Sequence, residues 1–217
     1  MQTGTAKVEI FSDAVMAIII TIMVLELKLP EFGVDQDEKD IEHHLIKVLP
    51  HFGAYIFSFV MVGILWFNHH HMFNLLEKTD NFLLGQNLFF LFWMSLIPFV
   101  TGVVGVNPTL PLSIALYGFI MMMISFSLSF MRTHTLKKGL VHTDEDKEVE
   151  TKIEKVTAKD RLKSFAVSAV YAASVPLAFV SVYLSYACFL IPIVIFLVSS
   201  GGNEKKVSDK VMEKNTL

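Results

Sequence analysis

Histidine is the most conspicuous candidate for chemistry in this sequence. Six of the eight histidines fall in the first third of the chain: His43, His44, His51, His69, His70 and His71. Imidazole is a common transition-metal ligand, so this concentration invites a metal site. However, three consecutive helical residues point about 100° apart and cannot bind one ion from one face. No cysteine or carboxylate cluster completes a set, so we expect no metal site.

Other reactive chemistry has little support. No nucleophile lies beside a base in a pattern typical of an enzyme, and the one cysteine, Cys188, lies in an apolar run. The formal net charge is −3, which does not favour nucleic-acid binding. We therefore expect neither an enzyme nor a nucleic-acid-binding protein, and no cofactor.

Asp13 is the second candidate, because it borders an apolar helix. The charge-free core of that helix is only Ala14–Leu25, with Asp13 at one end and Glu26 and Lys28 at the other. A carboxylate at such depth is unfavourable in lipid and normally faces protein or water. This helix is therefore expected inside a bundle or an assembly.

The elements that carry these residues follow from the distribution of charge. The chain is 53% hydrophobic, and no Asp, Glu, Lys or Arg occurs between Asp80 and Arg132 or between Lys163 and Glu204. Each gap is about twice the roughly 20 residues that cross a bilayer as a helix. The runs lack period-two alternation, which favours helices over a barrel. We predict an all-α integral membrane protein with apolar runs at Phe11–Leu29, Leu49–Phe67, Phe82–Val104, Leu110–Met131 and Ser164–Ser200.

The last run is too long for one crossing. A turn at Leu184-Ser185-Tyr186 would divide it, which gives six transmembrane helices. With six spans, fifteen of the 18 Lys and Arg residues fall on the side of the termini, so both termini are predicted to be cytoplasmic. We expect a six-helix domain over residues 1–200, including a cytoplasmic loop at 133–163, and a cytoplasmic tail at 201–217.

The first helix carries an apolar stripe. At 100° per residue, Ile22, Leu25 and Leu29 all fall within about 40° of Ile18, and Phe11 and Ala14 extend the row. Thr21 lies roughly 60° to the side, and Asp13 about 140° away. Packing within a helix bundle alone also produces such a pattern. The stripe is therefore either a packing surface or a functional surface.

Three segments resemble one family. Phe11-Ser12-Asp13 and the residues up to Thr21 resemble the first helix of the transmembrane protein 175 family, which comprises lysosomal potassium channels and their prokaryotic relatives. Trp66-Phe67-Asn68-His69-His70 with Phe73 resembles the end of the second helix, and Asn87–Phe92 followed by Leu96–Phe99 resembles the third. Lys7 stands where the family has Arg, and Lys lacks the planar bidentate geometry of guanidinium.

The resemblance implies a homotetramer in which the first helix of each subunit lines a central pore. The family's apolar ring positions fall on Ile18, Ile22 and Leu25, and a hydroxyl position linked to potassium selectivity falls on Thr21. The resemblance thus implies that Ile18 both narrows the pore and contributes to potassium selectivity. A structural network is expected to hold the first helix in place, with these members: Lys7, Phe11, Ser12, Asp13, His69, His70 and Asn87.

The expected function is a potassium-permeable, weakly potassium-selective cation channel in the plasma membrane. Its partners would be other copies of the chain, the lipid bilayer and monovalent cations. Thr101-Gly102-Val103-Val104-Gly105 faintly resembles a carbonyl filter, but it lies at the end of a full helix and is interpreted as a helix terminus. A secondary, proton-coupled transporter remains the alternative, since Pro98, Pro176 and Pro192 are potential helix breaks.

Overall fold

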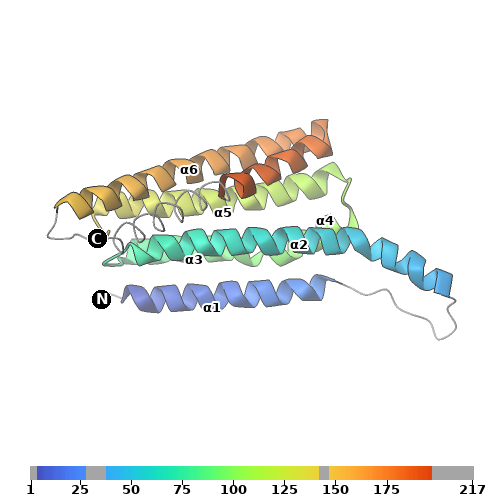
Figure 1. Cartoon of the computed structure of the whole chain (residues 1–217), viewed down its shortest axis with the longest axis horizontal. Helices are drawn as coiled ribbons and strands as arrows, with labels where there is room; N and C mark the ends of the chain where they lie inside the picture. The colour runs from blue at the N-terminus through green and yellow to red at the C-terminus, as the bar shows by residue number, and fades with distance from the viewer. Residues whose placement is uncertain (1–3, 28–37, 142–146, 197–217) are drawn as a thin grey trace, which may run out of the picture.

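The computed structural model describes residues 4–27, 38–141 and 147–196, which form a bundle of elongated helices (Figure 1). The elements are α1 (Thr5–Met23), the short 3-10 turn η1 (Val24–Glu26), α2 (Glu38–Asn74), α3 (Asn81–Ser95), α4 (Ile97–Val106), α5 (Pro111–Lys138), α6 (Lys147–Val180) and a final helix, Val182–Phe196.

Five helical segments are long and apolar enough to cross a membrane: Thr5–Glu26, Val48–Asn74, Asn81–Val106, Pro111–Lys138 and Ala158–Val180. The final helix is apolar but shorter. Within the described ranges no β-strand occurs, and Leu76 and Val141 form an isolated bridge between two helix ends. The prediction of an all-helical membrane protein with six apolar helices is confirmed.

The helices are arranged so that α1 lies along one side of the bundle and α6 along the other (Figure 1). α1 contacts α2, α3 and α4, whereas α5 packs most extensively against α6. Met16 and Met23 anchor the inner face of α1 in a core that includes Phe73 of α2 and Phe90 of α3, all fully buried. One face of α1 is therefore fixed by packing within the chain.

The third predicted span is divided at Leu96 into α3 and α4. Pro98 explains the division, because it has no backbone N–H and its ring clashes with the carbonyl four residues earlier. The sequence identified the span but not the break. The two helices still form one segment, Asn81–Val106, long enough to cross a membrane.

The turn expected at Leu184-Ser185-Tyr186 is misplaced. The helical path is interrupted at Ser181, and Ser185 is fully buried inside the final helix, where its hydroxyl donates to the Ser174 carbonyl at 2.9 Å. Tyr186 likewise donates to the Pro108 carbonyl at 2.8 Å. The polar residues that suggested a turn instead tie the final helix to its neighbours.

The expected cytoplasmic connection at 133–163, where the helical spacing of Val149, Ile153 and Val156 predicts a solvated helix, is largely helical where it is described. α5 continues to Lys138 and ends at Gly139, whose φ of 59° is the left-handed conformation that glycine adopts without a Cβ clash. α6 begins at Lys147, well before the apolar residues. The tail at 201–217 lies outside the described residues.

Candidate functional site

The apolar row predicted on the first helix lies on the outer face of α1. Ile18 is 56% exposed, Ile22 43% and Leu25 71%, and Phe11 and Ala14 are exposed in line with them. We call Phe11, Ala14, Ile18, Ile22 and Leu25 the α1 stripe; Leu29 lies outside the described residues. The opposite face is buried in the bundle through Val8, Ser12, Met16, Ile19 and Met23. The stripe is therefore largely exposed in the single chain.

Thr21 is exposed beside the stripe. Its hydroxyl donates to the Ile18 carbonyl at 2.8 Å, so its proton is engaged and its oxygen lone pairs remain available. A groove of about 400 Å³ runs along the same side of α1. Its walls come from α1 and η1 and from the α3–α4 junction: Val15, Ile18, Ile19, Ile22, Glu26, Ser95, Pro98 and Phe99.

A hydrogen-bonded chain connects the buried face of α1 to two other helices. Asn87 on α3 donates from Nδ2 to Ser12 Oγ on α1 at 2.8 Å, and its Oδ1 accepts from His69 Nε2 on α2, also at 2.8 Å. All three residues are fully buried. The His69 ring stacks between Phe73 and Phe90, with centroid distances of 4.5 and 5.2 Å. Because Asn87 Oδ1 can only accept, this geometry assigns the His69 proton to Nε2.

A second set of contacts joins α1 to α2 near the surface. Trp66 donates from Nε1 to Asp13 Oδ1 at 2.9 Å. His70 Nδ1 lies 3.0 Å from Glu9 Oε1 and 4.0 Å from Asp13 Oδ2. Sequence reasoning used Trp66 only as a family marker and missed this role. An indole N–H in an apolar segment needs an acceptor, and that requirement was the available signal.

Two predicted members of the network have no such contact. Lys7 is exposed on α1 and forms none of the ion pairs found among the described residues. Phe11 belongs to the exposed stripe rather than to the buried anchor. The structure thus brings together Ser12, Asn87 and His69, and separately Asp13 and His70, but it leaves Lys7 and Phe11 outside both groups.

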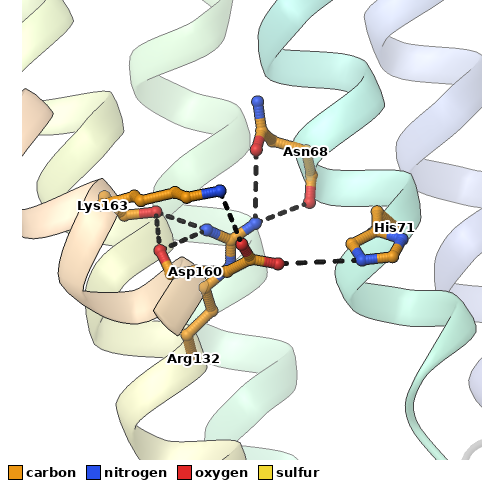
Figure 2. A network of polar contacts seen from close by, with 6 residues as sticks. Asn68, His71, Arg132, Asp160 and Lys163 are labelled. Atoms are coloured by element: carbon orange, nitrogen blue, oxygen red, sulfur yellow. Dashed lines mark hydrogen bonds and ion pairs between the residues drawn. The ribbon is translucent and has the colours of Figure 1, made fainter. Parts of the chain in front are cut away.

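Arg132 on α5 forms a buried polar centre that sequence reasoning did not identify (Figure 2). Its Nη1 donates to the Asp160 carbonyl at 2.9 Å and to Ser164 Oγ, and its Nη2 donates to the Asn68 carbonyl at 3.1 Å. The Asp160 carboxylate lies 3.7 Å from His71 Nε2. The signal in the sequence was the position of Arg132, which is the first charged residue after the uncharged stretch that follows Asp80.

Four consecutive residues of α2 therefore contact different helices. Asn68 and His71 meet α5 and α6 through Arg132 and Asp160, as Figure 2 shows, whereas His69 meets α3 and His70 meets α1. Residues three apart share a helix face, and adjacent residues do not. The Asn68–His71 turn consequently joins the outer α5–α6 pair to the helix that carries the stripe.

Comparison with known proteins shows which family the chain resembles. Residues 7–98 match the family model described as endosomal/lysosomal potassium channel TMEM175. A potassium channel of Chryseobacterium sp. (strain P1-3) is 47% identical over 112 residues, which cover 52% of this chain and 55% of that protein, so the match spans only about half of its length. A potassium channel of Chamaesiphon minutus is 28% identical over 92% of this chain and 97% of its own.

A solved structure extends the match over the whole fold. The crystal structure of a lysosomal potassium-selective channel TMEM175 homolog from Chamaesiphon minutus superposes with a TM-score of 0.72 and 25% identity, covering 90% of this chain and 97% of that one. The chain is thus similar to TMEM175 channels, in its first half by sequence and over most of its length by structure. The family model, both bacterial relatives and the solved structure are all named as channels.

Proposed function

We propose that the chain forms a potassium-permeable, weakly potassium-selective cation channel. The observation that carries the proposal is the α1 stripe, an exposed apolar row centred on Ile18 on a helix whose other face is anchored in the bundle. The names of the bacterial relatives, which are potassium channels, support the choice of ion.

The exposed stripe would be covered if four copies of the chain assembled around a common axis. Four α1 helices would then line a central pore, with rings formed by Ile18, Ile22 and Leu25. A narrow apolar ring gates by dewetting, and an ion that passes it sheds part of its hydration shell. Potassium holds its water less tightly than sodium, so such a ring favours potassium weakly. The free lone pairs of the Thr21 hydroxyl would offset part of that dehydration.

Selectivity by a carbonyl filter has no support in residues 101–105. This segment belongs to α4, where Thr101 Oγ1 donates to Ile97 O at 2.8 Å and lies within hydrogen-bond distance of Ser58 Oγ at 2.7 Å. Gly105 serves packing, since an added Cβ would lie 3.1 Å from the His51 Cα on α2. The constriction is therefore assigned to side chains on α1 and not to main-chain carbonyls.

We place the channel in the plasma membrane with both termini in the cytoplasm. The support is the excess of Lys and Arg in the segments on the side of the termini, which the positive-inside rule assigns to the cytoplasm. The network around Ser12, Asp13, Asn87 and His69 then lies toward the cytoplasmic half of the pore helix.

Cysteine cross-linking tests the assembly. In a Cys188→Ser background, Leu25→Cys places a thiol at the exposed end of the stripe, and Leu162→Cys places one on α6, where the residue is equally exposed at 71%. Mild oxidation is expected to cross-link subunits through position 25 and not through position 162. Native mass spectrometry should give four copies, and liposomes containing the protein should release potassium down its gradient. A monomer, or cross-linking at position 162 alone, would contradict the proposal.

A further inference from the structure

Glu9, Asp13 and His70 place three metal-ligating atoms around one point between α1 and α2. One carboxylate oxygen of each acid and one ring nitrogen of the histidine all lie within 4.8 Å of one another. His70 Nδ1 is 3.0 Å from Glu9 Oε1 and 4.0 Å from Asp13 Oδ2. Glu9 and Asp13 are one helical turn apart, so both carboxylates reach the same side of α1.

Trp66 orients two of the three side chains. Its indole N–H donates to Asp13 Oδ1, which leaves Oδ2 directed toward His70. Its ring stacks on the His70 ring with a centroid distance of 5.4 Å and an angle of 19°. Outer partners that fix the orientation of ligands are typical of built metal sites and strengthen binding. The histidine ring and one carboxylate are thus held in position before any ion arrives.

We propose that Glu9, Asp13 and His70 bind a divalent transition-metal ion of the zinc class. Zinc takes imidazole nitrogen and carboxylate oxygen at about 2.0–2.2 Å, which places neighbouring ligand atoms roughly 3.4 Å apart in a tetrahedron. The 3.0 and 4.0 Å separations bracket that value, so small side-chain rotations complete the geometry. Magnesium and calcium require six or more oxygens, which this mixed set of three ligands does not supply.

The site differs from the metal site considered in the sequence analysis. The expectation of no metal rested on the divergence of His69, His70 and His71, and the three side chains do diverge, toward α3, α1 and α6 respectively. That reasoning also relied on the lack of a cysteine or carboxylate cluster in the sequence to complete a set. It did not consider that a single histidine meets two carboxylates on a helix distant in sequence.

The bound ion would act as a clamp. It would join α1 to α2 and neutralise two carboxylates on the side of α1 away from the stripe, which would fix the helix proposed to line the pore. This consequence rests on the proposed function, whereas the binding itself does not. Micromolar zinc on the cytoplasmic side is therefore expected to change the current reversibly.

Calorimetric titration of the full-length protein, free of any polyhistidine tag, with zinc chloride tests the site. One site per subunit is expected in the wild type, and both Glu9→Gln and His70→Gln should weaken it at least tenfold. The matched control is His71→Gln, because His71 is adjacent and exposed but faces Asp160. Equal weakening in His71→Gln, or unchanged binding in His70→Gln, would overturn the proposal.

Cobalt(II) absorption provides a readout that does not depend on affinity alone. Coordination by four or five protein and water ligands gives an intense visible spectrum, and this spectrum should be lost in His70→Gln and retained in His71→Gln. Folding of each variant is checked by its elution volume and thermal unfolding. If the protein binds zinc but gives no ionic current, the metal site stands and the proposed channel function is contradicted. A failure of the site can therefore be distinguished from a failure of the proposed function.

Discussion

Asn87 on α3 donates a hydrogen bond to Ser12 on α1, and both side chains are fully buried. With His69 on the other side of Asn87, the three polar groups form a continuous chain through the core of a membrane protein. Buried polar groups are unfavourable unless satisfied, so each member depends on the other two. The position of the stripe helix is thus set by specific polar contacts as well as by apolar packing.

Replacing Asn87 with Leu should destabilise the protein. The substitution leaves Ser12 Oγ and His69 Nε2 without their partner, at a cost of about 1–3 kcal/mol for an unsatisfied buried group. Thermal unfolding in detergent should therefore begin at a lower temperature. The control is Gln86→Leu, because the amide of Gln86 is buried and has no hydrogen-bond partner among the described residues. Similar losses in both variants would refute a specific role for Asn87.

Replacing Asp13 with Ala should lower tetramer yield and potassium current together. The change removes the acceptor of the Trp66 indole and frees α1 from α2. Trp66→Phe removes the same bond from the other side and is expected to reproduce part of the effect. Native mass spectrometry measures the assembly, and flux from liposomes measures conduction. Normal assembly with normal flux in Asp13→Ala would show that this contact is dispensable.

Replacing Arg132 with Met should loosen the outer helices from α2. The apolar side chain cannot donate to the Asn68 and Asp160 carbonyls or to Ser164, and buried acceptors left unpaired cost about 1–3 kcal/mol. Arg132→Lys should recover little, because an ammonium lacks the planar fork of guanidinium. Lys137→Met, further along α5 and exposed, serves as the control. Equal unfolding temperatures for all three variants would count against this centre.

Asp80 should make stability depend on acid pH. Partial burial raises the pKa of its carboxyl, but the hydrogen bonds from the Leu83 amide and from His134 outweigh that effect, so the pKa lies below its usual value. Because the pKa of Asp80 is lower in the folded protein, its ionised carboxylate stabilises the fold fully above the pKa of the unfolded chain, about 3.9. This stabilisation is lost as the pH falls through the pKa of the folded protein. The difference in unfolding temperature between wild type and Asp80→Ala should be constant near neutral pH and shrink below about pH 4.

Asp80→Asn separates the two contributions of this residue. Asparagine still caps the N-terminus of α3 but carries no charge, so its advantage over alanine should not change with pH. A difference in unfolding temperature between the wild type and Asp80→Asn that persists unchanged at low pH would argue against the assignment.

The stripe was predictable because helical periodicity needs only residue spacing. Ile18 and Ile22 on α1 and Leu25 on η1 are exposed together, as the 100° rotation predicted. The gaps without charge likewise predicted the number of apolar helices. Both features are local properties of the chain, which explains why one sequence was enough.

Long-range partners were not predictable in the same way. Trp66 meets Asp13 across 53 residues and Arg132 meets Asn68 across 64, and no local pattern specifies such pairs. The break at Ser181 was missed because the nearby serine and tyrosine are satisfied by main-chain carbonyls of other helices. Polar residues in an apolar run therefore indicate either a turn or an interhelical contact, and only the fold distinguishes the two.

Single-channel recording in a planar bilayer, with potassium opposed to sodium, tests the central claim most directly. Wild-type protein should give discrete unitary currents that reverse toward the potassium potential. Ile18→Ala should widen the constriction, raise the unitary current and move the reversal potential toward zero, whereas Ile20→Ala, on the other side of α1, should not. Silence in the bilayer, together with slow, saturable or proton-coupled flux in liposomes, would contradict the account and indicate a transporter.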